Sequence, residues 1–99
     1  MSRKWAAKAD GNQPALVKFI RKLGASFQHT HRIPGALDGI IGYEGLDQRV
    51  EIKDPSATSQ ALTEAEAKVF NEWKGRKPVV IMTEEDIESL LADMRKAGL

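Results

Sequence analysis

The chain has 99 residues, 41% hydrophobic and 29% charged, and its 15 basic and 14 acidic side chains give a formal net charge of +1. This length fits a single domain, residues 1–99, with one core, and the balanced charge makes local clusters more informative about partners than the total. The absence of cysteine excludes disulfides and thiolate zinc sites, and without an apolar run that could span a membrane or serve as a signal peptide we expect a cytoplasmic protein.

The chain begins with a basic segment, residues 1–9, which we expect to be flexible and which includes Trp5, a residue that could stack on a base or anchor a partner. Asn12-Gln13-Pro14 then predicts a helix start, because an amide can cap a helix and proline fits the first turn. An apolar stripe follows, made of Ala15, Leu16, Phe19, Ile20 and Leu23. Gly24 is expected to end this helix.

Three strands are predicted next. Residues 25–32 place Phe27 between polar neighbours and predict the first strand, and Pro34-Gly35 turns the chain toward a second strand that begins near Leu37. Residues 42–47 predict a hairpin connection, and residues 49–53 the third strand.

The third predicted strand carries charge on one face only. Side chains alternate along a strand, so Glu51 and Lys53 point one way while Val50 and Ile52 point into an apolar layer. Asp38 stands near the start of the preceding strand, so we expect the two acids to be neighbours.

The second half predicts a helix, a strand and a helix. Thr63 and Glu66 have the spacing of a capping box, and Gly75 is expected to end that helix. Its predicted buried side is made of Ala65, Val69, Phe70 and Trp73. Residues 78–82 are wholly apolar, which predicts a central strand covered on both faces.

The last helix is predicted to start at Thr83, which is followed by three acids suited to the positive end of a helix dipole. Its inward residues are expected to be Ile87, Leu90, Leu91 and Met94. The predicted order is α-β-β-β-α-β-α, an α/β fold with a small mixed sheet flanked by helices.

The acid pair indicates metal chemistry. Two carboxylates that converge at strand ends, Asp38 and Glu51, can hold Mg²⁺ or Mn²⁺, and the ammonium of Lys53 can position a water or stabilise charge on a phosphate. The alternative is that Glu51 and Lys53 form an ordinary solvent-facing ion pair on the strand.

These residues resemble the PD-(D/E)xK nucleases, and within them the small virus-type replication-repair (VRR) nucleases of phages and prophages. The resemblance covers residues 10–91. It rests on the helix that ends at Gly24, the turn 35–38, the segment 50–53, the capping box 62–66 and the passage 75–82.

The resemblance implies a restriction-endonuclease-like core and a catalytic set of Asp38, Glu51 and Lys53. The metal is expected to bind Asp38, Glu51 and the backbone carbonyl of Ile52, while Lys53 orients the attacking water. Leu37 stands where the family usually has proline, so the turn can differ in detail. Gln13 stands where many relatives have a glutamate, and an amide binds Mg²⁺ more weakly, which leaves the number of metals open.

Several polar residues are secondary candidates. Gln13 and Gln60 are candidate accessory residues, although a surface role in a loop is an alternative for Gln60. His29, His31 and Arg32 are candidate DNA contacts. The two histidines without a third ligand make a weak zinc signal.

Glu66 is explained by its capping box and is left out of the metal set.

The predicted function is that of a metal-dependent DNA endonuclease that hydrolyses phosphodiester bonds. By resemblance the substrate is branched DNA of the Holliday-junction type, the assembly a homodimer, and the setting a bacterial host cell if the origin is a phage or prophage. One alternative is a non-catalytic DNA-binding or phage assembly protein that retains the nuclease fold. Another is a restriction-type nuclease that needs a separate specificity subunit.

Overall fold

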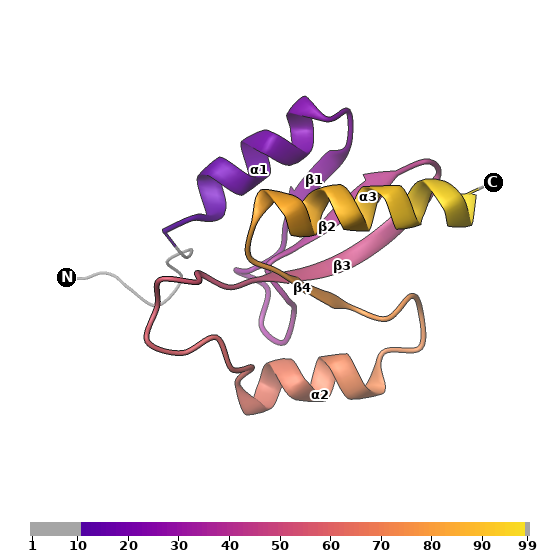
Figure 1. The fold of residues 1–99 in the computed structure, drawn as a ribbon. Helices are drawn as coiled ribbons and strands as arrows, with labels where there is room; N and C mark the ends of the chain where they lie inside the picture. Colours follow the sequence, from indigo (N-terminus) through magenta and orange to yellow (C-terminus); the bar gives the residue numbers. More distant parts are fainter. Residues whose placement is uncertain (1–10, 99) are drawn as a thin grey trace.

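The computed structural model describes residues 11–98 as a sheet with three helices (Figure 1). Its elements are α1 (Gln13–Lys22), β1 (Ser26–His29), β2 (Gly39–Tyr43), β3 (Leu46–Ile52), α2 (Glu64–Glu72), β4 (Val79–Ile81) and α3 (Glu84–Gly98). This order confirms the predicted α-β-β-β-α-β-α arrangement. The predicted basic N-terminus, residues 1–9 with Trp5, lies outside the described residues.

The sheet is mixed, as predicted, and its strands follow the order β1-β2-β3-β4. The pairs β1–β2 and β2–β3 are antiparallel, whereas β3 and β4 are parallel. The prediction that residues 78–82 form a central strand is wrong, because β4 lies at the edge and Val79 and Val80 are only half-buried. An apolar run in the sequence therefore does not show whether another strand pairs beyond it.

The core lies between the sheet and the pair α1 and α3, which contact each other and strands β1 and β2 (Figure 1). All four inward residues predicted for α3 are buried: Ile87, Leu90, Leu91 and Met94. The predicted α1 stripe is partly wrong, because Val17 and Gln13 are buried while Ala15 and Leu23 are exposed. The face of α1 that packs on the core is therefore made of Gln13, Leu16, Val17 and Ile20.

Helix α2 does not join this core. The prediction of a buried side for it is wrong, since none of its residues is buried and Trp73 is 41% exposed. The helix also ends at Glu72 with Trp73 as its C-cap, before the expected Gly75. The guanidinium of Arg49 lies 3.9 Å from the Trp73 ring centroid, so a cation on β3, rather than the core, holds this aromatic side chain.

Among residues 11–98, no helix combines the length and the apolar composition that a membrane span requires.

The turns between the strands have the conformations that their residue types favour. Glu44 and Gly45 both have positive φ, 54° and 79°, and join β2 to β3 as a two-residue hairpin turn, which confirms the predicted hairpin. The first strand is shorter than predicted and ends at His29, because the next residue, Thr30, starts the turn toward Asp38.

Thr30 holds the loop that leads to Asp38. Its hydroxyl donates to the carbonyl of Leu37 at 2.6 Å, and its backbone N–H donates to the carbonyl of Asp38 at 2.9 Å. Both Thr30 and Leu37 are buried, at 6% and 2% exposure. These hydrogen bonds of Thr30 close the loop 30–38 and bring the chain back to the sheet at Asp38.

We expect Thr30→Val to lower the free energy of unfolding by about 1–3 kcal/mol, because it leaves the buried carbonyl of Leu37 without its donor. Chemical denaturation measures this value. Thr58→Val, at an exposed position, serves as the control and should change stability by less than about 0.5 kcal/mol. Equal stability losses in the two variants would contradict the role assigned to Thr30.

Candidate active site

The register of the sheet sets Asp38 beside Glu51. Gly39 on β2 pairs with Val50 on β3, so one residue further the extended register faces Asp38 with Glu51. Side chains opposite each other on neighbouring strands share a face, with Cβ atoms about 5 Å apart. The predicted neighbourhood of the two acids therefore agrees with the strand pairing.

Asp38 is fixed against the end of β3. Its Oδ2 atom accepts a hydrogen bond of 2.7 Å from the backbone N–H of Ile52. The N–H and C=O of one strand residue leave the same edge of the strand, so the Ile52 carbonyl also faces the side on which Asp38 lies. The three predicted metal ligands, Asp38, Glu51 and the Ile52 carbonyl, thus meet at one end of the β2–β3 pair.

Glu51 is a buried acid that keeps its proton at neutral pH. It is 5% exposed, while Val50 and Ile52 are fully buried in the core, which confirms the predicted alternation. Burial, a hydrogen bond with Glu66 and the negative charges of Asp38 and Glu66 raise the pKa of Glu51 to about 9, against a smaller opposite effect of Lys53. Neutral Glu51 is thus the hydrogen-bond donor to Glu66.

Lys53 lies between two carboxyl groups. Its Nζ atom is 2.9 Å from Oε1 of Glu66 and 3.6 Å from Oε2 of Glu51, and its side chain is 14% exposed. Its backbone N–H donates to the carbonyl of Ile81 on β4. The ammonium is thereby held on the same face as Glu51, as the alternation predicts.

Glu66 belongs to this cluster, although sequence reasoning assigns it only a capping role. The capping box is confirmed: Thr63 N–H donates to Glu66 Oε1 at 2.9 Å, and Glu66 N–H donates to Thr63 Oγ1 at 3.2 Å. Burial acts to raise the pKa of Glu66, but hydrogen bonds from Glu51, Thr63 and Lys53 lower it below its usual value. The Glu66 carboxylate therefore caps the N-terminus of α2 and also forms an ion pair with Lys53.

The spacing of Thr63 and Glu66 in the capping box offered a clue that Glu66 lies near the site. The capping box fixes its side chain back toward the residue before the helix, and that end of α2 follows the loop leaving β3. The sequence did not indicate that this loop folds back over the face carrying Glu51.

The prediction that Asn12 caps α1 with its amide is wrong, because its side chain makes no capping bond. Its Nδ2 atom donates instead to the carbonyls of Lys53 and Met82, each at 3.1 Å. Since these carbonyls follow β3 and β4, Asn12 ties the start of α1 to the strand ends beside the candidate site.

The chemistry of these donors fits a divalent cation. Carboxylate and carbonyl oxygens are the ligands that Mg²⁺ and Mn²⁺ prefer. Within residues 11–98 no group of three or more His, Cys, Asp or Glu side chains is arranged to hold a metal. The set of Asp38, Glu51 and Ile52 differs from such a group because its third ligand is a backbone carbonyl.

The accessory candidates separate into two kinds. Gln13 is buried, with 1% exposure, and its Nε2 atom lies 3.4 Å from Nδ1 of His29. The amide of Gln60 instead donates to the carbonyls of its own loop, at Asp54, Pro55 and Ala57. Gln60 thus organises the loop 54–60, whereas Gln13 lies near the strand ends.

The remaining predicted DNA contacts follow β1. His31 lies beyond the strand rather than on it, but its ring still packs edge-to-face against His29, with centroids 5.7 Å apart. Arg32 is exposed in the following turn. The three side chains therefore come from one end of β1 and the turn after it.

Comparison with protein-family models, with curated proteins and with solved structures finds no match to this chain. The geometry of the site is therefore the basis on which its function is inferred.

Proposed function

We propose that this protein is a metal-dependent DNA endonuclease with a restriction-endonuclease-like core. The observation that carries the proposal is the juxtaposition of Asp38 and Glu51 at the end of adjacent strands, with the ammonium of Lys53 on the same face. The element order and the antiparallel strands followed by a parallel β4 support it as well. The sequence segments on which the resemblance to PD-(D/E)xK nucleases rests include two that carry this pair, the turn 35–38 and the segment 50–53.

The residues divide the chemistry among them. Asp38, Glu51 and the Ile52 carbonyl would hold Mg²⁺ or Mn²⁺, which when bound neutralises charge on the phosphate and lowers the pKa of a coordinated water. Before Glu51 can act as a ligand it must lose the proton that it donates to Glu66.

Lys53 is assigned to the attacking water. Its Nζ would donate a hydrogen bond that orients the water oxygen toward phosphorus, while Asp38 and Glu51 would act on the phosphate only through the cation that they hold. The new bond between the water oxygen and phosphorus forms as the bond to the 3′ oxygen breaks; the attacking water releases a proton to solvent, and the 3′ oxygen takes one up. The products carry a 5′-phosphate and a 3′-hydroxyl.

We further propose branched DNA as the substrate and a homodimer as the active form. A chain of 99 residues offers little surface for reading base edges, which favours recognition of backbone shape. A two-fold dimer would present two such sites to strands of opposite polarity, as a four-way junction requires. The exposed Trp73 beside α2 offers apolar surface to a second copy, and the edge strand β4 offers backbone groups.

The test compares cleavage of a four-way junction with that of linear duplex, in Mg²⁺, in Mn²⁺ and in chelator. We expect cleavage of the junction only with metal, and none by Asp38→Asn, which should still bind DNA. Light scattering on the same sample gives the mass of the active species. A wild type that binds but never cuts would replace the nuclease by the non-catalytic DNA-binding alternative.

A further inference from the structure

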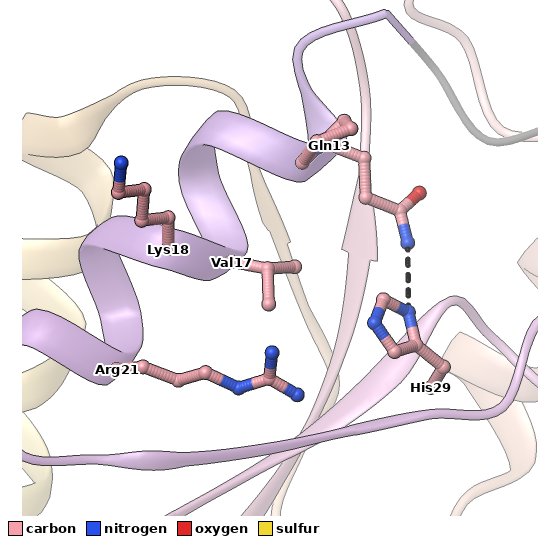
Figure 2. Close-up of a pocket in the computed structure, with 6 residues that line it drawn as sticks. Gln13, Val17, Lys18, Arg21 and His29 are labelled. Carbon is pink, nitrogen blue, oxygen red and sulfur yellow. Dashed lines mark hydrogen bonds between the residues drawn. The ribbon is translucent and has the colours of Figure 1, made fainter.

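A pocket of about 440 Å³ opens between α1 and β1, on the side of the sheet that α1 covers (Figure 2). Six residues line it: Gln13, Pro14, Val17, Lys18, Arg21 and His29. None of them belongs to the cluster of Asp38, Glu51, Lys53 and Glu66. We call this cavity the α1 pocket.

The α1 pocket is basic. Its lining includes Lys18 and Arg21 but no acidic side chain. Figure 2 shows the Arg21 side chain extending from α1 toward His29, beneath Val17, with Lys18 further out along the helix. Arg21 donates from one guanidinium nitrogen to the carbonyl of Phe27 at 3.1 Å, which fixes a planar group that has further N–H donors to offer an anion.

His29 contributes a directed donor. When Nδ1 accepts from the Gln13 amide, as the 3.4 Å contact indicates, the proton of the neutral ring is carried by Nε2. In Figure 2 that second nitrogen faces the pocket. The buried Gln13 therefore sets which nitrogen of His29 is offered to a ligand.

Gln13 itself is incompletely satisfied. Its Oε1 atom is buried and has no hydrogen-bond partner among residues 11–98. A buried amide normally bonds through both of its polar atoms, and this oxygen needs a donor, which a water in the pocket can supply and a phosphodiester cannot.

The apolar part of the lining narrows the ligand class. Pro14 and Val17 present carbon surface beside the cations, and the volume exceeds what a phosphate group alone needs. A sugar-phosphate unit of a nucleic-acid strand has both parts, an anion for Arg21 and His29 and an apolar sugar for the proline and valine.

The α1 pocket also lies at the same end of the sheet as the acid pair. His29 ends β1 and pairs with Gly39, the residue after Asp38. Only β2 separates β1 from β3, so the His29 and Glu51 backbones are about 10 Å apart at the usual strand spacing. His29 shares the face of Gly39 and Val50, which α1 covers, whereas Asp38 and Glu51 lie on the opposite face. A DNA strand that contacts both sites therefore has to pass around this end of the sheet.

We propose that the α1 pocket binds a backbone phosphate of the same DNA strand whose phosphodiester is flanked by Asp38 and Glu51, where that strand passes around the end of the sheet. The choice of DNA rests on the proposed function, while the anion site itself rests on Arg21 and on His29, whose ring contacts the Gln13 amide.

The first test measures binding of a four-way junction in chelator, so that catalysis is not involved. Arg21→Gln removes the charge but keeps an amide that can donate to Phe27, and Lys22→Gln removes an equal charge from the same helix outside the pocket. We expect Arg21→Gln to weaken binding about tenfold and to reduce the slope of log K against log salt by about one, with less than half that effect in Lys22→Gln. Equal effects of the two variants would overturn the proposal.

A second test places one uncharged methylphosphonate linkage at each position of the strand in turn. Wild-type protein should lose affinity at a linkage close to the scissile bond, and in Arg21→Gln or His29→Ala the same linkage should cost nothing further. This measurement also works if one of the variants folds poorly, because the wild type alone gives the contacted position. No sensitive linkage near that bond would overturn the proposal.

The two proposals fail differently. DNA binding that depends on Arg21, without any cleavage, would reject the nuclease and retain the α1 pocket. Metal-dependent cleavage unaffected by Arg21→Gln and His29→Ala would retain the nuclease and reject the α1 pocket. Absence of DNA binding by the wild type would reject both.

Discussion

Lys53→Met is expected to slow DNA cleavage by about 10²–10⁴-fold while leaving DNA binding and metal binding in place. Methionine keeps much of the length and apolar stem of lysine but has no proton or charge to give to a water or a phosphate. The metal ligands assigned to Asp38, Glu51 and Ile52 stay intact in this variant. Single-turnover cleavage measures the rate, and calorimetric titration with Mn²⁺ measures the metal affinity.

The matched comparison is Asp38→Asn, which removes a ligand rather than the water-orienting group. It should lose both cleavage and Mn²⁺ affinity, because an amide replaces a charged carboxylate. Lys68→Met, on the exposed side of α2, controls for the loss of one lysine and should cleave at the wild-type rate. Normal cleavage by Lys53→Met would remove Lys53 from the mechanism and leave a binding site only.

Glu51→Gln is expected to stabilise the metal-free protein at alkaline pH even though it destroys the proposed site. In the unfolded chain Glu51 loses its proton near the ordinary glutamate pKa of 4.5, whereas in the folded chain the proton stays until about pH 9. Between these values the folded state binds more protons, so this residue makes stability fall as pH rises, with no further change above about pH 9. Glutamine resembles the neutral acid and does not titrate.

The difference between wild type and Glu51→Gln should therefore be near zero at pH 4 and reach about 1–3 kcal/mol in favour of the variant at pH 8. Denaturant titrations at a series of pH values in chelator give both curves. Saturating Mn²⁺ should reverse the order, because only the wild type gains stability from a bound ion. A variant that is less stable than wild type at pH 8 without metal would show that Glu51 is already ionised and paired.

Much of the fold follows from local patterns. The capping box at Thr63 and Glu66, the hairpin turn at Glu44 and Gly45 and the apolar positions of α3 each depend on residues close in sequence, and each prediction is confirmed. The shared face of Glu51 and Lys53 follows from strand alternation alone. The facing of Asp38 and Glu51 required only a correct hairpin register.

The errors concern contacts between distant segments. Residues 78–82 have the composition of a central strand, but the crossover through α2 returns the chain to an open edge of β3, and no local pattern records that choice. The apolar residues of α2 have helical periodicity, yet Trp73 packs against the Arg49 guanidinium and not into the core. The local sequence around Asn12 predicts a helix cap. Its actual partners, the carbonyls of Lys53 and Met82, lie far along the chain and cannot be inferred from that local pattern.

The double use of Glu66 couples the order of a helix to the state of the site. The same oxygen, Oε1, accepts from the Thr63 backbone at the start of α2 and from Lys53, while the carboxylate also takes the hydrogen bond of Glu51. Any event that removes the proton of Glu51 or draws Lys53 away changes the free energy with which α2 is anchored. By thermodynamic reciprocity, fraying of α2 would change the affinity of the acid pair for the proposed cation by the same factor.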